Sequence, residues 1–182
     1  MEKVKYKLTD ETMEKYGITF YRIMALKDFG DVKSGDKGGW VQSEKNLDQY
    51  RNAWVYGDAK VYGNANVFGD ANVFGNARVH GDANVYGDAR VYGNACIYGE
   101  ARVYGEAKVY GEAKVSSISD ILLIGPIGSR LSFLTIIKKL DYVATGCFCG
   151  TKDQFLDQVK DTHGDNEHAR MYRKAIEFAF SD

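Results

Sequence analysis

Two short strings in the last third of the chain carry residue types suited to binding an anion. The first, residues 125–130, reads Gly-Pro-Ile-Gly-Ser-Arg and joins two glycines to a hydroxyl and a guanidinium. Backbone N–H groups in a glycine turn and the fork of an Arg side chain can cradle an anionic oxygen. The P-loop spacing Gly-x-x-x-x-Gly-Lys-Ser is absent. The same residues would also suit a plain β-turn with Arg130 on the surface.

The second string, residues 145–151, reads Thr-Gly-Cys-Phe-Cys-Gly-Thr. We expect it where a strand meets the N-terminus of a helix, because Thr151 and Gln154 form a capping-box pattern. Free N–H groups at such a terminus favour anions, and Phe148 can stack on a planar ring. The alternative is a strand end followed by an N-cap with no ligand. The Lys138–Lys139 pair either adds charge or is simply solvated.

Short strands and two helices must position these strings. We predict strands over residues 121–124, 131–137 and 142–148, followed by a helix from Thr151 to about Thr162 that stops at Gly164. A second helix is expected after Asp165. Its apolar face is predicted to hold Ala169, Tyr172, Ile176 and Phe180.

The strongest pattern in the chain is a repeat of six residues. Ala recurs at every sixth position from 53 to 113, Val or Ile from 55 to 115, and Gly from 57 to 111. A helix would lose about 1 kcal/mol at each of these glycines. Alternation in a short strand places Ala and Val on one face, and Gly followed by Asp, Asn or Glu turns the chain. One such strand cannot bury its Val alone, so the copies must stack.

Residues 53–115 resemble the hexapeptide repeats of left-handed parallel β-helices. The resemblance implies a triangular coil of eighteen residues, and homotrimers are common in such families. Stacking would then sort the outward rings into three ladders. These are Tyr56, Phe74, Tyr92 and Tyr110; Tyr62, His80 and Tyr98; and Phe68, Tyr86 and Tyr104. The ladders either stiffen the solenoid or form a subunit interface.

Residues 1–52 lack the repeat and are expected to form a small N-terminal cap. Thr9 can cap a short helix reaching about Tyr16, and residues 18–26 are predicted to form a strand. An open solenoid end is a sticky edge, so we expect apolar side chains to cover it. The predicted covering residues are Trp40, Leu47 and Trp54.

The predicted fold class is therefore an all-β solenoid, a left-handed parallel β-helix, with a small N-terminal cap and a C-terminal α+β domain. The domains are residues 1–52, 53–117 and 118–182. Residues 38–55 and the two C-terminal strings resemble a widespread phage and bacterial hexapeptide family. The resemblance extends to residues 163–166 and to the closing helix.

The resemblance implies a non-enzymatic oligomeric protein, phage-derived, that sequesters a nucleotide-like ligand such as a host immune signal. The predicted ligand-binding residues are Gly128, Ser129, Arg130, Thr135, Phe148, Gly150 and Thr151. We expect no catalytic residue, no cofactor and no metal. The expected partners are the ligand and further copies of the chain in a trimer, with no DNA duplex and no membrane.

The composition and the positions of the histidines limit the other functions that the chain could have. Lys plus Arg is 24 and Asp plus Glu is 25, a net charge of -1, which disfavours a strongly basic nucleic-acid binder. Three cysteines and no apolar N-terminal run suggest a cytoplasmic protein, in the host cell if phage-encoded. An acyltransferase using acyl-CoA is the enzymatic alternative, although His80, His163 and His168 form no evident catalytic or zinc set. A structural scaffold is the third possibility.

Overall fold

The computed structural model describes residues 4–181. The chain folds as two compact units, which divide between Ile118 and Ser119. The predicted boundary after residue 117 falls beside this division. The N-terminal residues up to 52, in contrast, belong to the same compact unit as the repeat.

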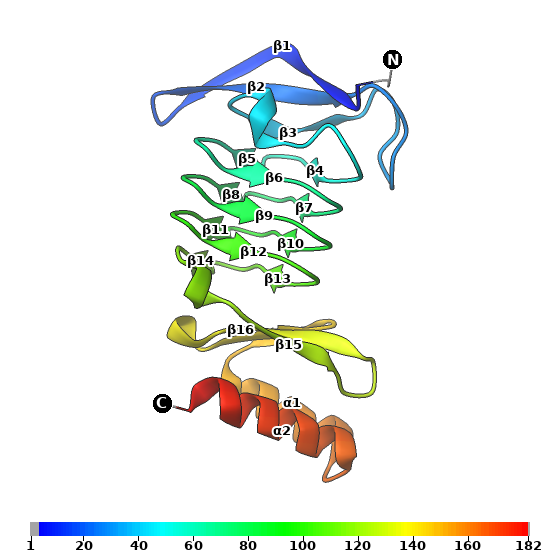
Figure 1. Ribbon diagram of the computed structural model, residues 1–182, viewed down its shortest axis with the longest axis vertical. Helices are drawn as coiled ribbons and strands as arrows, with labels where there is room; N and C mark the ends of the chain where they lie inside the picture. The colour runs from blue at the N-terminus through cyan, green and yellow to red at the C-terminus, as the bar shows by residue number, and fades with distance from the viewer. Residues whose placement is uncertain (1–3, 182) are drawn as a thin grey trace. The chain divides into compact units, whose positions relative to one another are not determined.

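Parallel two-residue strands build the repeat (Figure 1). Each strand pairs with the strand eighteen residues later, as in the series Val55, Val73, Val91 and Val109. This register confirms the predicted parallel β-solenoid with three hexads in each coil. The strands are β4 (Trp54–Val55), β5 (Lys60–Val61), β6 (Asn66–Val67), β7 (Asn72–Val73), β8 (Arg78–Val79), β9 (Asn84–Val85), β10 (Arg90–Val91), β11 (Cys96–Ile97), β12 (Arg102–Val103), β13 (Lys108–Val109) and β14 (Lys114–Val115).

The solenoid core consists of the predicted Ala and Val or Ile positions. Every Val or Ile of the repeat from Val55 to Val115 is fully buried. Glycine is required at the turns for two reasons, as Gly87 shows. Its φ is +70°, and an added β-carbon would lie 2.9 Å from the backbone nitrogen of Gly105 in the next coil. The coils can therefore stack closely only when the corner has no side chain.

All three predicted ring ladders are present. Phe74 and Tyr92 stack with centroids 4.6 Å apart, and Tyr92 and Tyr110 stack at 4.4 Å. Tyr56 meets Phe74 edge-on at 6.4 Å. The remaining contacts confirm the other two ladders: Tyr62–His80, His80–Tyr98, Phe68–Tyr86 and Tyr86–Tyr104.

The N-terminal segment extends one face of the solenoid. Strands β1 (Tyr6–Lys15), β2 (Ile18–Ala25) and β3 (Lys37–Val41) continue the sheet in the order β1-β2-β3-β5-β8-β11-β14. A 3-10 turn, η1 (Glu44–Asn46), follows. Trp40, Leu47 and Trp54, predicted to cover the solenoid end, are all buried.

The predicted helix from Thr9 to Tyr16 is wrong, because residues 9–15 belong to β1 and Tyr16 lies in the turn that follows. Tyr16 and Gly17 both adopt positive φ, 58° and 70°, which makes the tight turn of a hairpin. Segment 6–15 then pairs antiparallel with β2, from Tyr6 opposite Ala25 to Lys15 opposite Ile18, with an irregularity in the register between Leu8 and Thr12. Sheet pairing outweighs the local capping signal at Thr9.

The C-terminal unit packs two helices on a four-stranded antiparallel sheet (Figure 1). Its strands follow the sequence order, and the predicted strands over 121–124 and 131–137 are confirmed. The predicted strand 142–148 is two strands, because Gly146, with φ +50°, turns the chain. The elements are η2 (Ile118–Asp120), β15 (Leu122–Ile127), β16 (Ser132–Ile137), η3 (Lys138–Leu140), β17 (Tyr142–Thr145), β18 (Phe148–Gly150), α1 (Lys152–His163) and α2 (Glu167–Phe180).

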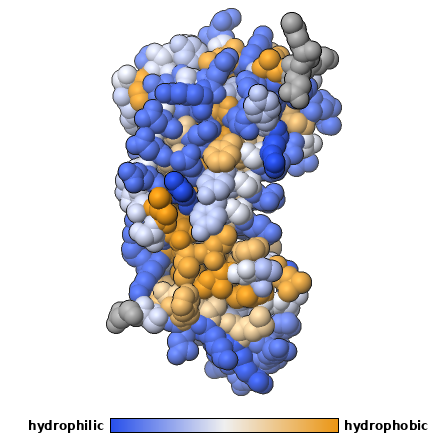
Figure 2. All heavy atoms as spheres, in the orientation of Figure 1, coloured by the Kyte–Doolittle hydropathy of each residue, from blue (hydrophilic) through white to orange (hydrophobic). Residues whose placement is uncertain are grey.

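The helix boundaries follow the predicted signals. Thr151 caps α1 in a capping box with Gln154, and Gly164 ends the helix. Asn166 caps α2, one residue beyond the predicted start. Figure 2 shows apolar side chains gathered over the strands of this unit and polar side chains over much of its helices. The predicted face of α2 is buried at Ala169, Tyr172 and Ile176, and Phe180 packs at its margin.

A buried lysine fastens the chain where it enters the repeat. Lys5 is fully buried, and its Nζ donates to the carbonyl oxygens of Tyr50 at 3.2 Å and Ala53 at 2.8 Å. The same Nζ lies 5.3 Å from the ring centroid of Phe29. Burial lowers the pKa of Lys5 to about 8. Burial removes water from the ammonium group, which is unfavourable. In return, the ammonium supplies a hydrogen-bond donor to two backbone carbonyl oxygens.

The first prediction concerns Lys5→Met. The variant should lose about 1–3 kcal/mol of unfolding free energy at pH 7, because two buried carbonyls lose their donor. Since the folded pKa of about 8 lies below the ordinary value of 10.5, the folded state binds fewer protons between these pH values. Wild-type stability should thus rise relative to the variant from pH 8 to 10.5, by at most about 3 kcal/mol.

Urea unfolding at a series of pH values measures this difference. Lys7→Met, at an exposed position of β1, is the matched control and should show neither effect. A gap between wild type and Lys5→Met that does not change with pH would contradict the role given to burial.

Candidate functional site

A cavity of about 430 Å³ lies within the C-terminal unit. Two turns, one face of α1 and Tyr172 of α2 surround it. In a meander of antiparallel strands, the β15–β16 turn and the β17–β18 turn fall at the same end of the sheet. Helix α1 runs back toward this end and covers it. The lining residues are Ser129, Arg130, Ser132, Thr145, Gly146, Cys147, Phe148, Phe155, Gln158, Val159, Thr162, His163 and Tyr172.

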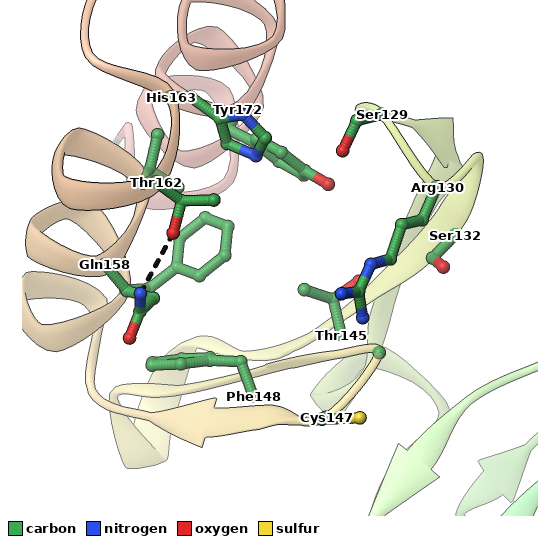
Figure 3. A pocket seen from close by; sticks show the side chains of 13 residues that line it. Ser129, Arg130, Ser132, Thr145, Cys147, Phe148, Gln158, Thr162, His163 and Tyr172 are labelled. Carbon is green, nitrogen blue, oxygen red and sulfur yellow. Dashed lines mark hydrogen bonds between the residues drawn. The ribbon is translucent and has the colours of Figure 1, made fainter.

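The cavity brings together the centres of the two strings found in the sequence. Ser129 and Arg130 lie in the β15–β16 turn, which the Leu131 amide closes by donating to the Gly128 carbonyl at 3.3 Å. Figure 3 shows the Arg130 side chain on one side of the cavity, above the β17–β18 turn, with Phe148 on the opposite side. Predicted site residues Ser129, Arg130 and Phe148 thus share one cavity.

Gly128 shapes this end of the cavity without lining it. Its φ is +73°, and an added β-carbon would overlap the hydroxyl group of Tyr172. Only glycine therefore allows the tyrosine hydroxyl to approach the turn. Burial raises the pKa of Tyr172, and the nearby positive charge of Arg130 opposes this rise. At neutral pH the tyrosine remains a neutral hydroxyl facing a cation.

The charged side chains that line the cavity are of one sign. Its lining includes Arg130, and none of the lining residues in the described chain is Asp or Glu. The hydroxyl groups of Ser129, Ser132 and Thr162 add polar groups that can donate. An anionic ligand would therefore meet a guanidinium and hydroxyl donors, with no carboxylate in the wall to repel it.

Thr145 carries an unpaired hydroxyl in this wall. Its Oγ1 is buried and has no hydrogen-bond partner within residues 4–181. A buried hydroxyl without a partner is unfavourable. Thr145 lines the same cavity as Arg130, so this hydroxyl lies close to the space that a ligand would occupy.

Aromatic rings form the other wall. Phe148 lies 5.3 Å from Phe155 between ring centroids, and Phe155 meets Tyr172 edge-on at 5.4 Å. The ring of His163 lies 5.9 Å from that of Tyr172. At the edge of this wall, Gln158 Nε2 donates to Thr162 Oγ1 at 3.0 Å (Figure 3). A planar ring entering the cavity would find apolar faces and one amide.

Thr135 lies outside the cavity. Its neighbours Leu134 and Ile136 belong to the core beneath the helices, so alternation along β16 turns Thr135 to the opposite face of the sheet. Gly150 also lies outside the lining. An added β-carbon there would sit 2.9 Å from Phe148 Cζ and 2.6 Å from Gln154 Oε1, so Gly150 makes room for the Phe148 ring.

The start of α1 is already occupied by the protein's own groups. Thr151 Oγ1 accepts from the Gln154 amide at 3.3 Å, and Gln154 Oε1 accepts from the Thr151 amide at 2.9 Å. The carboxylate of Asp141 accepts from the Lys152 amide at 3.1 Å. An anion approaching Thr151 would have to displace this carboxylate. The flanking lysines are also engaged, Lys138 with the Ser181 carbonyl and Lys139 with Asp120.

Sequence reasoning missed several lining residues. Ser132 and Thr145 could have been found by counting from the core residues Leu134 and Val143, because side chains two apart share a strand face. Gln158 follows Phe155 by three residues and Thr162 follows Gln158 by four, a helical spacing that places all three on one face of α1. Local motifs alone gave no reason to combine these elements.

The histidines do not converge on one site. His80 stacks between Tyr62 at 4.8 Å and Tyr98 at 5.6 Å in the solenoid, and its Nε2 lies 3.5 Å from Cys96 Sγ. His163 and His168 lie in the C-terminal unit with ring centroids 5.8 Å apart. Within residues 4–181 no group of three or more His, Cys, Asp or Glu side chains could hold a metal ion. None of the helices described is long and apolar enough to span a membrane.

Comparison with known proteins concerns the repeat. A family model described as the YdcK beta solenoid repeat matches residues 83–99. A curated relative, the acetyltransferase YdcK of Escherichia coli K12, whose description calls it uncharacterized, is 35% identical over 60 residues. That match covers 29% of this chain and 18% of the relative, so the chain spans less than a fifth of the relative's length. With the parallel solenoid, these matches fit a hexapeptide-repeat β-helix family.

The second prediction concerns the unpaired hydroxyl. Thr145→Val keeps the shape of the side chain and removes the Oγ1 that has no partner. The ligand-free variant should be more stable than wild type by about 1 kcal/mol. Thr162→Val is the matched control. It should lose stability, because Gln158 would lose its acceptor. Urea unfolding measures both, and destabilisation by Thr145→Val would show that its hydroxyl is paired in solution.

Proposed function

We propose that the protein is a non-enzymatic oligomeric binding protein whose C-terminal unit captures an anionic, nucleotide-like ligand. The observation that carries this proposal is the composition of the cavity wall. One guanidinium, an unpaired buried hydroxyl and a set of aromatic rings face one space with no carboxylate among them. Anionic oxygens at one end and a planar ring at the other satisfy all three features.

Binding would use charge-assisted hydrogen bonds and stacking. Arg130 donates two N–H groups to phosphate oxygens, and Ser129 and Thr145 donate hydroxyl hydrogens. The ring of the ligand lies against Phe148. A cavity of about 430 Å³ is within the range of about 300–1,000 Å³ typical of small-molecule sites. No bond of the ligand is broken, so it is released intact.

The biological role follows the resemblance of the two turn motifs to a phage and bacterial family. A phage-encoded protein of this kind would act in the host cytoplasm and lower the free concentration of a nucleotide immune signal. Capture without turnover requires many binding sites, and an oligomer supplies several sites for each particle. The solenoid would hold the subunits together through its ring ladders.

Two other functions have specific support. The curated relative's name favours an acyltransferase, and turnover of acetyl-CoA by the purified protein would establish it. The uniform repeat suits a structural scaffold, and concentration-dependent filaments would indicate that role. The scaffold alternative does not explain why Arg130, Thr145 and Phe148 line one cavity. Acyl-CoA also carries phosphates and an adenine ring, so turnover of the ligand separates the enzyme from the binding protein.

The third prediction tests ligand capture. In a thermal-shift screen of mononucleotides, cyclic dinucleotides and acetyl-CoA, a nucleotide should stabilise wild type, by about 2.7 kcal/mol at one hundred times its Kd. Arg130→Ala should weaken binding of that nucleotide at least tenfold, because a hydrogen-bonded charge contributes about 1.5–3 kcal/mol. Lys174→Ala, at an exposed site on α2 outside the cavity, is the control. Undiminished binding by Arg130→Ala would place the site elsewhere.

The fourth prediction tests assembly. Native mass spectrometry should show three chains in each particle. Tyr86→Glu, in the middle of one ladder, should yield monomers, because a charge in an apolar contact is unfavourable. Circular dichroism checks that this variant keeps its strands. A wild-type protein that is monomeric at micromolar concentration would contradict assembly through the ladders.

A further inference from the structure

Tyr172 is a buried tyrosine whose hydroxyl group ends in the cavity. The residue is only 6% exposed, and its hydroxyl makes no hydrogen bond to any of the described residues. Figure 3 shows this hydroxyl directed into the cavity, toward the side where Ser129 and Arg130 lie. A largely buried hydroxyl needs a hydrogen-bond partner. The cavity is the place from which such a partner can come.

The packing around the tyrosine ring fixes the position of the hydroxyl oxygen. Phe155 meets the ring edge-on with centroids 5.4 Å apart, and the ring of His163 lies 5.9 Å away. At the other end of the side chain, Gly128 lies so close that an added β-carbon would overlap the hydroxyl. The oxygen therefore keeps its place while its hydrogen can rotate. A ligand that meets it loses little side-chain entropy from the protein.

A tyrosine hydroxyl can donate or accept, and the charge beside it decides which role the ligand meets. The positive charge of Arg130 reaches Tyr172, since it lowers the pKa of the phenol against the larger, opposite effect of burial. A ligand group that accepts from the guanidinium is also an acceptor for the phenol. A donor group of a ligand would instead lie beside a cation, with no Asp or Glu of the described chain in the lining to offset it. The surroundings thus favour donation by Tyr172 to an anion.

We propose that Tyr172 is a ligand-binding residue whose hydroxyl donates a hydrogen bond to the oxyanion held by Arg130, and that this oxyanion is a phosphate group. The inference rests on the proposed function, because it takes the anionic end of the captured ligand to lie at Arg130. The donors come from two elements, the turn that carries Ser129 and Arg130 and the helix α2 that carries Tyr172. The tetrahedral oxygens of a phosphate point in several directions and suit such an arrangement better than a planar carboxylate.

Tyr172→Phe removes the hydroxyl and keeps the ring. Calorimetric titration should give a Kd for AMP at least about tenfold higher in this variant than in wild type, because a hydrogen bond to a charged group is lost. Adenosine is the same ligand without the phosphate, and it should bind wild type and variant equally. This comparison assigns the lost interaction to the phosphate.

The stability of the ligand-free protein separates a binding role from a structural one. Because the hydroxyl has no partner among the described residues, Tyr172→Phe should unfold at a temperature no lower than wild type. Tyr6→Phe is the matched control, since the Tyr6 hydroxyl donates to the carbonyl oxygens of Glu44 at 2.9 Å and Leu47 at 2.7 Å. This control should show the opposite pattern, a lower thermal stability with unchanged affinity for AMP.

Inorganic phosphate tests the anion position without a base. At equal ionic strength, phosphate should raise the unfolding temperature of wild type more than acetate does, and it should have a smaller effect on Tyr172→Phe. Equal effects of phosphate and acetate on wild type would overturn the assignment to a phosphate group.

The outcomes distinguish this inference from ligand capture itself. Equal affinities of wild type and Tyr172→Phe for AMP, or equal losses for AMP and adenosine, would overturn the role of Tyr172 and leave ligand capture in place. Wild type that binds neither AMP nor inorganic phosphate would overturn it as well. Another nucleotide that binds through Arg130 in the screen would then keep the proposed function alone, whereas a screen in which no nucleotide binds would reject that function too.

Discussion

The equal spacing of the repeat is the constraint on which the first unit depends. Each Val must fall over the Val eighteen residues away, because only then does every coil bury the same core and pair the same backbone groups. A single inserted residue would turn the inward side chains of a strand outward. The glycine corners enforce the same register, since the coils approach too closely there for any β-carbon. The ring ladders are a consequence of this register.

The C-terminal unit depends on a different constraint, the order of its strands. An antiparallel meander brings every second turn to one end of the sheet, so Arg130 and Thr145 meet although fifteen positions separate them in sequence. The helix that follows β18 must return across the sheet, and it brings Gln158 and Thr162 to the same end. Asp141 fills the opposite end, where the helix starts. The anion site therefore lies at the turns and away from the helix N-terminus.

The sequence predicted what depends on short-range patterns. The period of six fixed the solenoid and the three ladders, and the capping box at Thr151 fixed the start of α1. Segment 6–15 was misjudged as a helix because its partner strand lies beyond the local window. Thr135 was placed in the site by nearness in sequence, whereas alternation along β16 turns it to the other face of the sheet. Gly150 shares a strand face with Phe148, and it makes room for that ring without lining the cavity. Gln158 and Thr162 were missed because helical spacing, and no local motif, places them on the face of α1 that lines the cavity.

A crystal structure of the protein with the nucleotide that stabilises it most in the thermal-shift screen tests the central claim most directly, because it locates the anion and the ring in one measurement. The account predicts phosphate oxygens within hydrogen-bonding distance of Arg130 and Thr145, with the base lying on Phe148. Phosphate bound at Thr151 with Asp141 displaced, or a nucleotide bound only outside this cavity, would contradict the account.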